Sequence, residues 1–227
     1  MRPPAQPQQG GTQEELNAAQ TLATQWAPPD TWTVVRPRFF TALMQLQQDE
    51  PAEAERILAE IVAYDDSLNA AYYERHKNLP LEPDSSGPVR HALGEAYGRQ
   101  GKLVAAITTL EKAVELTELA EGGGHPAVLS ARLALVEVLL AAHRDVDAQH
   151  VLAFISIAQL SALPAVHPIV AQWDRVNGIL ALRQNNTTEA RKSLRAAFEI
   201  YQRIYGAKHW RTTRAKEELL LTGNEDV

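Results

Sequence analysis

The sequence predicts an all-α fold in which helical hairpins stack in line as an α-solenoid, and two observations lead to this class. A histidine recurs every 42 residues, at His125, His167 and His209, and the first two are followed by proline. Small and apolar residues keep the same interval: Ala106, Ala148 and Ala190; Leu110, Leu152 and Leu194; Ala113, Ile155 and Ala197. A fixed period of roughly 20–50 residues is typical of stacked repeats.

Composition limits the classes of function. The 227 residues carry 22 basic and 28 acidic side chains in a mixed pattern, and the net charge of −6 gives no basic surface for nucleic acid. The absence of cysteine excludes disulfides, thiolate catalysis and cysteine-bound zinc. We expect no signal peptide, because the N-terminus lacks an apolar core. We expect no membrane insertion, because the longest uncharged stretch, 148–173, is interrupted by polar residues and prolines. A soluble protein is predicted, either cytoplasmic or a periplasmic domain of a larger protein.

The N-terminal part predicts a tail followed by helices. Residues 1–11 are rich in Pro, Gln and Gly, which predicts a disordered tail or a linker. A linker would suggest a domain cut from a larger protein, and a frayed terminus is the alternative. A capping box at 12–15 begins a helical region that we place at 12–78.

One degenerate repeat is expected within this region, at 37–64. Its first helix would run from Pro37 to Gln48 with Phe40, Leu43 and Leu46 facing inward. Asp49 would cap its second helix, on which Ala54, Leu58 and Ile61 copy the spacing of the later repeats. A short helix is predicted at 67–77.

Three regular repeats and a capping helix are predicted after a Pro- and Ser-rich connector at 79–87, within a second region, 88–227. The expected helices are 88–100 and 102–119, 126–142 and 145–162, 168–184 and 187–205, and finally 210–222. Gly101 marks the first turn, Asp145 and either Asn186 or Thr187 are expected caps, and the polar last helix would close the solenoid.

These residues resemble the tetratricopeptide repeat (TPR). Leu93-Gly94-x-x-Tyr97 followed by Ala106-x-x-x-Leu110-x-x-Ala113 is similar to its pattern, although Val136 replaces the glycine in the second repeat. The 42-residue interval and the His-Pro pairs resemble the kinesin-light-chain-like subclass. The resemblance implies a right-handed superhelix whose first helices line a concave groove that binds peptides or partner proteins. Such repeats also occur as sensor or docking domains beside kinases and transcription regulators.

No residue pattern predicts catalysis, a cofactor or a metal. Equivalent histidines of stacked repeats lie at least roughly 8–10 Å apart, whereas zinc needs nitrogen ligands at about 2 Å. We therefore interpret each histidine as marking a helix start. The Gly-rich stretch 121–125 lacks the Lys-Ser/Thr of a phosphate loop, and no nucleophile–base pair is evident.

The expected groove face recurs about every four residues along each first helix. It carries His91, Glu95 and Arg99; Leu133, Glu137 and Leu140; and Gln172, Arg175, Ile179 and Arg183. A partner segment with apolar anchors and an acidic end would suit this face, and the alternative is an ordinary solvated surface. The basic and asparagine clamp that the family uses for a C-terminal carboxylate is not visible.

A second candidate surface is apolar. Ala153, Phe154 and Ile157 occupy positions on the second helix of repeat two where the neighbouring repeats carry charged residues. We interpret them as an interface with another subunit in a homodimer, with the rest of a larger protein, or with the N-terminal helices. Local burial by the curvature of the superhelix is the alternative.

The sequence as a whole predicts a non-enzymatic scaffold or adaptor that binds a protein or peptide. The alternative is a ligand-sensing or regulatory domain of a larger kinase or transcription regulator. A pocket lined by His91, Glu95, Arg175 and Arg183 would favour that alternative. A hydrolytic or metal enzyme is disfavoured, because no site constellation is present.

Overall fold

The computed structural model describes residues 32–75 and 86–223. The chain divides into two compact units, Met1–Leu79 and Pro80–Val227. Every regular element in the described ranges is a helix, which confirms the predicted all-α class. The expected tail, the first N-terminal helix and most of the expected connector lie outside the described residues.

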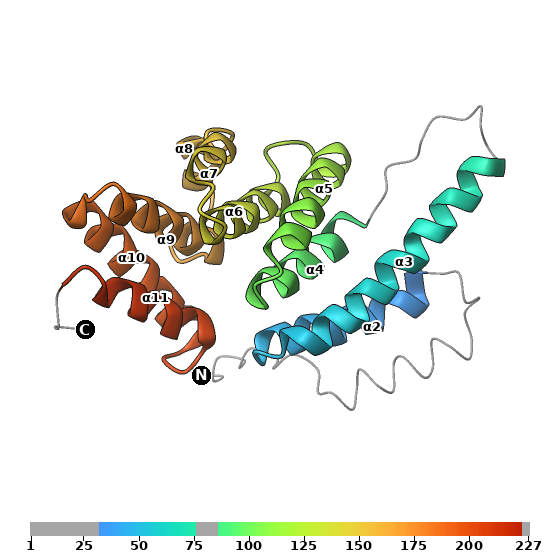
Figure 1. Cartoon of the computed structure of the whole chain (residues 1–227), viewed down its shortest axis with the longest axis horizontal. Helices are drawn as coiled ribbons and strands as arrows, with labels where there is room; N and C mark the ends of the chain where they lie inside the picture. Colours follow the sequence, from blue (N-terminus) through green and yellow to red (C-terminus); the bar gives the residue numbers. More distant parts are fainter. Residues whose placement is uncertain (1–31, 76–85, 224–227) are drawn as a thin grey trace, which may run out of the picture. The chain divides into compact units, whose positions relative to one another are not determined.

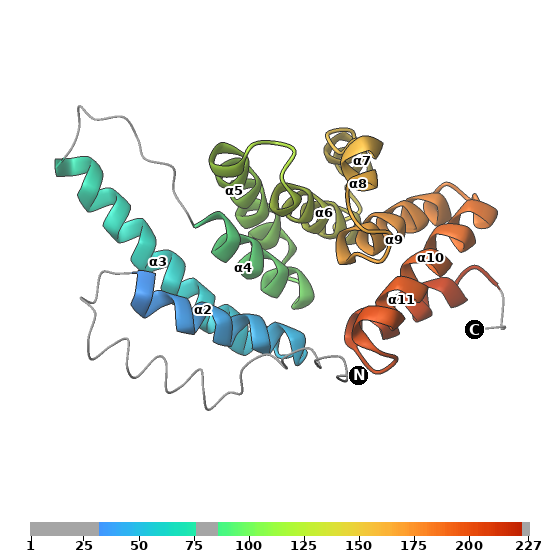
Figure 2. The same cartoon turned by 180° about the vertical axis from the view of Figure 1, so that it is seen from behind.

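The first unit contains a hairpin of two helices, α2 (Trp32–Gln47) and α3 (Pro51–Arg75) (Figure 2). Ala54, Leu58 and Ile61 are buried on α3, as their spacing predicts. Two expectations were wrong. The helix expected at 67–77 is the continuation of α3, and Phe40 is exposed because Ala42 and Leu46 take the buried positions of α2. Asp49 lies in the turn with a φ of 66°, two residues before α3 begins, and its role as a cap stays a prediction.

The second unit is a row of hairpins (Figure 1). Its helices are α4 (Gly87–Arg99), α5 (Leu103–Glu121), α6 (Pro126–Ala141), α7 (Asp145–Leu152), α8 (Ile157–Ser161), α9 (Pro168–Arg183), α10 (Thr187–Tyr205) and α11 (Trp210–Leu220). Neighbours in the row pack directly: α4 on α5, α5 on α6, α6 on α7 and α9, α9 on α10, and α10 on α11. We call α4, α6, α9 and α11 the A helices, because each is the first helix of its repeat.

The 42-residue register describes real structural equivalence. Ala106, Ala148 and Ala190 are all fully buried. A Cβ atom on Gly94 would lie 2.4 Å from Leu110 Cγ, and one on Gly178 would lie 2.6 Å from Leu194 Cγ. Glycine at these positions therefore allows the two helices of a hairpin to approach closely, with a leucine filling the remaining space.

The recurring histidines cap the helices that follow them. His125 Nδ1 accepts a hydrogen bond from the backbone N–H of Ala127 at 3.3 Å. His167 Nδ1 accepts in the same way from Ile169 at 3.2 Å, and His209 Nδ1 accepts from Arg211 at 3.2 Å. Each imidazole satisfies one backbone donor of the first helical turn, so the period of 42 residues is a period of helix starts.

Replacing His167 with alanine is expected to lower the free energy of unfolding by about 1 kcal/mol, because Ile169 N–H loses its acceptor. His167→Asn should keep most of the stability, since a short amide side chain is also a good cap. Urea unfolding of the three proteins measures both effects. Equal midpoints for the alanine variant and the parent would show that the cap contributes nothing.

The second helix of repeat two is interrupted, which corrects the single helix expected at 145–162. It forms α7 and α8, separated by a turn at 153–156. Arg132 Nη1 donates to the carbonyl of Phe154 at 3.1 Å, which diverts this carbonyl from helical hydrogen bonding. Ser156 and Gln159 then form a capping box that begins α8.

Candidate functional site

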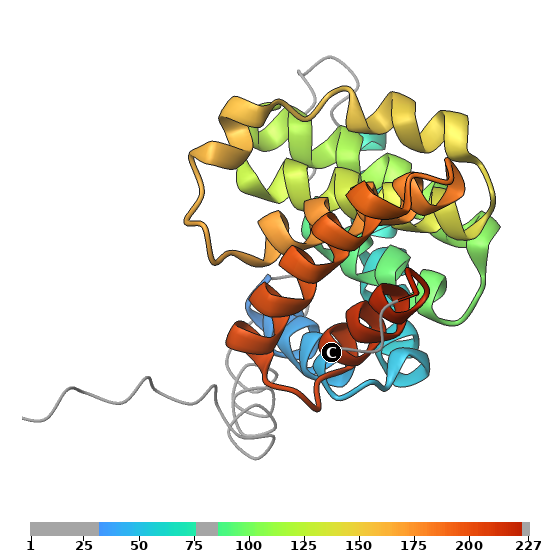
Figure 3. The ribbon, with the colours of Figure 1, turned by 90° about the vertical axis from the view of Figure 1, so that its left-hand side faces the viewer.

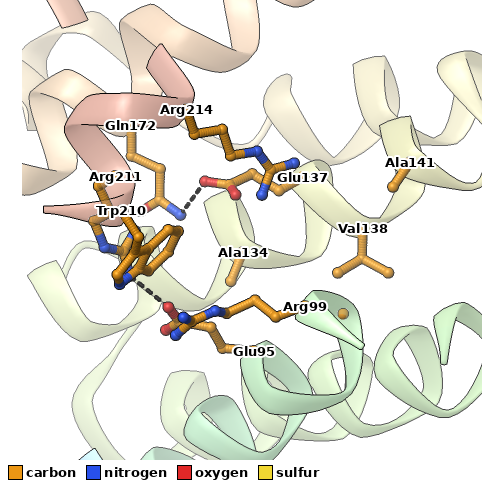
Figure 4. Close-up of a pocket in the computed structure, with 11 residues that line it drawn as sticks. Glu95, Arg99, Ala134, Glu137, Val138, Ala141, Gln172, Trp210, Arg211 and Arg214 are labelled. Atoms are coloured by element: carbon orange, nitrogen blue, oxygen red, sulfur yellow. Dashed lines mark hydrogen bonds and ion pairs between the residues drawn. The ribbon is translucent and has the colours of Figure 1, made fainter. Parts of the chain in front are cut away.

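The A helices converge on one pocket of the second unit (Figure 4), which holds about 430 Å³ with its open mouth included. We call it the A-helix pocket. Its lining residues come from all four A helices: Glu95, Gly98, Arg99, Ala134, Glu137, Val138, Ala141, Gln172, Trp210, Arg211 and Arg214. Residues separated by more than 100 positions in the sequence therefore share one surface.

Small residues form the apolar part of the pocket. Gly98 of α4 faces Val138 of α6, and a Cβ atom at Gly98 would lie 2.8 Å from Val138 Cγ2. Ala134 is buried, whereas Ala141 is exposed at the end of α6. These side chains leave room for a small apolar group, and Ala141 is the position where a larger side chain could fill that room.

A buried ion-pair network joins three of the A helices beside the pocket. Arg175 Nη1 lies 2.8 Å from Glu137 Oε2, and only 4% of the Arg175 side chain is exposed. The same guanidinium donates to both carboxylate oxygens of Glu218, at 2.6 Å each, and Gln172 Nε2 donates to Glu137 Oε1 at 2.7 Å. Bidentate pairing of this kind fixes the orientation of both groups.

The charge state of this network follows from its surroundings. Burial alone would raise the pKa of Glu137, but Arg175, Arg214 and Arg211 together with the Gln172 hydrogen bond lower the pKa to about 2. Burial also lowers the pKa of His91. At neutral pH the site therefore presents an ionised Glu137 and a neutral His91.

The opposite rim of the pocket is cationic and aromatic. The Arg99 guanidinium carbon lies 4.0 Å from the ring centroid of Trp210, and that of Arg211 lies 4.4 Å from it. Arg211 Nη2 also donates to Glu95 Oε1 at 2.6 Å. Figure 4 shows Trp210 and Arg211 extending from α11 toward Glu95 and Arg99 of α4. Cation–π contacts hold Trp210 in place.

The structure places some of the predicted groove residues in the pocket. Those that line it are Glu95, Arg99, Glu137 and Gln172. Arg175 is buried beside Glu137, and His91 is half-buried, with a pKa that responds to Glu95 and Arg211. Use of these residues in binding stays a prediction.

Other predicted groove residues lie elsewhere. Leu133 and Leu140 are core residues, which corrects their placement, because α6 turns the face containing Ala134, Glu137 and Ala141 to the pocket. Ile179 packs against the same core. Arg183 pairs with Asp145 and donates to the Leu140 carbonyl, and it does not line the A-helix pocket.

Three pocket residues were missed: Trp210, Arg211 and Arg214. They lie on α11, which the sequence presented as a polar terminal cap. The signal that could have identified them is His209, since it places α11 in the phase of an A helix and therefore on the groove side.

The apolar candidate surface lies at the interruption between α7 and α8. Phe154 and Ile157 are 57% and 66% exposed, and Ala153 is also exposed. Local burial by curvature, the alternative interpretation, is wrong for these side chains. A partner for this surface stays a prediction.

Two other classes of site are absent from the described ranges, 32–75 and 86–223. No group of three His, Cys, Asp or Glu side chains is placed there to hold a metal. None of the helices in those ranges has the length and apolar character needed to cross a bilayer.

Known proteins share this architecture. Residues 178–211 match the family model of the tetratricopeptide repeat. The crystal structure of BtubC (BKLC) from P. vanneervenii is similar with a TM-score of 0.62 and 14% identity, covering 92% of this chain and 80% of that one. Crystal structures of nearly identical TPR-like repeats from Podosopora anserina, described as those of a kinesin light chain, have a TM-score of 0.54 and 21% identity, covering 83% of this chain and 84% of theirs. No match was found among curated proteins.

Proposed function

We propose that this chain, whose residues 178–211 match the tetratricopeptide repeat, is a non-enzymatic adaptor that binds an extended segment of a partner protein in the A-helix pocket. Repeats of this family generally mediate protein–protein interaction. The observation that carries the proposal is the convergence of four A helices on one pocket with an apolar floor and arginines at its rim.

The chemistry of the pocket favours a partner segment that carries an acidic residue beside a small apolar one. The methyl groups of Ala134, Val138 and Ala141 offer apolar contact to the small side chain. Arg214 keeps 42% of its side chain exposed and lies 3.4 Å from Glu218, so its charge faces the opening as well as its partner. Guanidinium groups bind carboxylates through paired N–H donors.

Ala141→Trp is expected to weaken peptide binding by at least about tenfold, a loss of roughly 1.4 kcal/mol, because the indole fills the apolar floor. The peptide is obtained by selecting a displayed random library on the immobilised 227-residue chain, and its Kd is measured by calorimetry. The matched control is Ala105→Trp, at an exposed position on α5 outside the pocket, which should leave Kd unchanged.

Two results would contradict the proposal. The first is a selection that enriches no acidic peptide. The second is an Ala141→Trp variant that binds the selected peptide as tightly as the parent and the Ala105→Trp control. Either result would place recognition on another surface, such as the exposed side chains of Phe154 and Ile157.

A further inference from the structure

The first and last A helices are bridged across the pocket, although their hairpins are three positions apart in the row. Repeats of a solenoid normally contact only their neighbours. Here Arg211 of α11 donates to Glu95 of α4 at 2.6 Å, and Arg99 of α4 lies over Trp210 of α11 at 4.0 Å (Figure 4). We call these four residues the clasp. Figure 3 views the ribbon from the end of the row that holds α10 and α11, coloured orange and red.

We propose that the clasp occupies one side of the A-helix pocket from within the chain, and that a partner segment binds there after the clasp has opened. The inference rests on the proposed function and concerns its regulation. Glu95 occupies Arg211 with a carboxylate, which is the group that an acidic partner would bring. The Glu95 carboxylate therefore competes with the partner for the same cation, and the stability of the clasp sets the apparent affinity.

The closed clasp leaves two hydrogen-bond donors unused. Trp210 Nε1 and Arg211 Nε are buried, and neither has an acceptor among residues 32–75 and 86–223. A buried donor without an acceptor disfavours the state that contains it. Opening would expose these groups to water, and a partner's carbonyl or carboxylate could then accept from them. The Arg211–Glu95 ion pair and the Arg99–Trp210 contact thus stabilise the closed clasp, and the two donors without acceptors destabilise it. This balance allows the clasp to open reversibly.

Opening keeps each hairpin packed on its neighbour and lets the α4 end of the row move away from α11. The clasp is made by long side chains, and about a fifth of the Glu95 side chain stays exposed, at 21%. In contrast, α11 packs directly on α10 and is tied to α9 through the buried Arg175–Glu218 pair. Loss of the clasp therefore frees the α4 side of the pocket while α11 keeps its attachment to its own repeat.

Spin labels can test the clasp directly, because the chain has no cysteine of its own. Cysteines at two exposed positions, Lys102→Cys beside α4 and Lys216→Cys on α11, would carry the labels in the full chain. Double electron–electron resonance should give one short distance in the parent. Glu95→Ala should add a population at longer distance. Glu111→Ala, the same charge change at an exposed position on α5, should not.

Affinity gives the second measurement, with hexaglutamate as the probe. If about a tenth of the parent is open, a fully open variant gains up to about tenfold in apparent affinity. We expect Glu95→Ala to bind hexaglutamate about five- to tenfold more tightly than the parent, and Glu111→Ala to stay within about twofold of the parent. Arg99→Gln, which removes the other half of the clasp, should lengthen the label distance in the same way as Glu95→Ala. It replaces Glu95→Ala as the test variant if that protein folds poorly.

The outcomes separate the clasp from the proposed function. Unchanged label distances in both Glu95→Ala and Arg99→Gln overturn the clasp, even if hexaglutamate binds. Equal affinity of the parent and Glu95→Ala for hexaglutamate overturns its regulatory role. Longer distances without hexaglutamate binding by any of the proteins overturn the proposed acidic ligand and leave the clasp established as a conformational contact.

Discussion

Replacing Arg175 with methionine is expected to lower the free energy of unfolding by about 3–5 kcal/mol at pH 7, because two carboxylates lose their shared buried partner. Arg175 is paired with Glu137 at 2.8 Å and with Glu218 at 2.6 Å. Urea unfolding of the full chain measures the loss. The matched control is Arg144→Met, which removes an exposed pair with Asp147 and should cost less than about 1 kcal/mol.

The same substitution has a pH dependence with a definite sign. In the parent, the pKa of Glu137 is about 2, below its ordinary value of 4.5, so its ionisation stabilises the fold above pH 4.5 and this contribution is lost as pH falls toward 2. Without Arg175, burial acts more strongly on the Glu137 carboxyl and shifts its pKa upward. In acid, protonation of Glu137 removes the unpaired buried charge from the variant. The difference in the free energy of unfolding between the parent and the variant should therefore shrink from pH 7 to pH 3. A difference that stays constant over that range would show that Arg175 does not stabilise through these carboxylates.

Leu194→Ala is expected to cost about 2–5 kcal/mol, because it removes a fully buried side chain that fills the space beside Gly178. The equivalent Leu110→Ala should have a similar effect, and Leu152→Ala a smaller one, because Leu152 is 8% exposed and Leu110 is fully buried. Urea unfolding of each variant measures these losses. Leu221→Ala at an exposed position is the control and should stay within about 0.5 kcal/mol of the parent. An unchanged midpoint for Leu194→Ala would mean that the 42-residue register does not describe the packing.

Most of the fold could be predicted because its determinants are local and repeated. Small residues, leucines and capping histidines recur at one interval, so the helix boundaries follow from the sequence to within a few residues. The interruption between α7 and α8 was missed, although Ser156 and Gln159 have the spacing of a capping box at the start of α8. It depends on Arg132 reaching the carbonyl of Phe154, 22 residues away, and no spacing rule reports such a contact.

The site was predictable in part. The choice of the A helices as the pocket lining was useful, and Glu95 and Glu137 follow from it. On α6 the expected face was rotated around the helix axis. A shift of one residue is a rotation of about 100°, so Ala134 faces the pocket where Leu133 was expected. The contact between Glu95 and Arg211 joins residues 116 positions apart, so it emerges only when the hairpins are stacked.

A methyl NMR titration tests the central claim most directly. The alanine, valine and isoleucine methyl groups of the full chain would be labelled, and the acidic peptide enriched in the library selection would be added. Binding in the A-helix pocket predicts chemical-shift changes concentrated at Ala134, Val138 and Ala141. Changes concentrated instead at Ala153 and Ile157, with the pocket methyl groups unmoved, would contradict it.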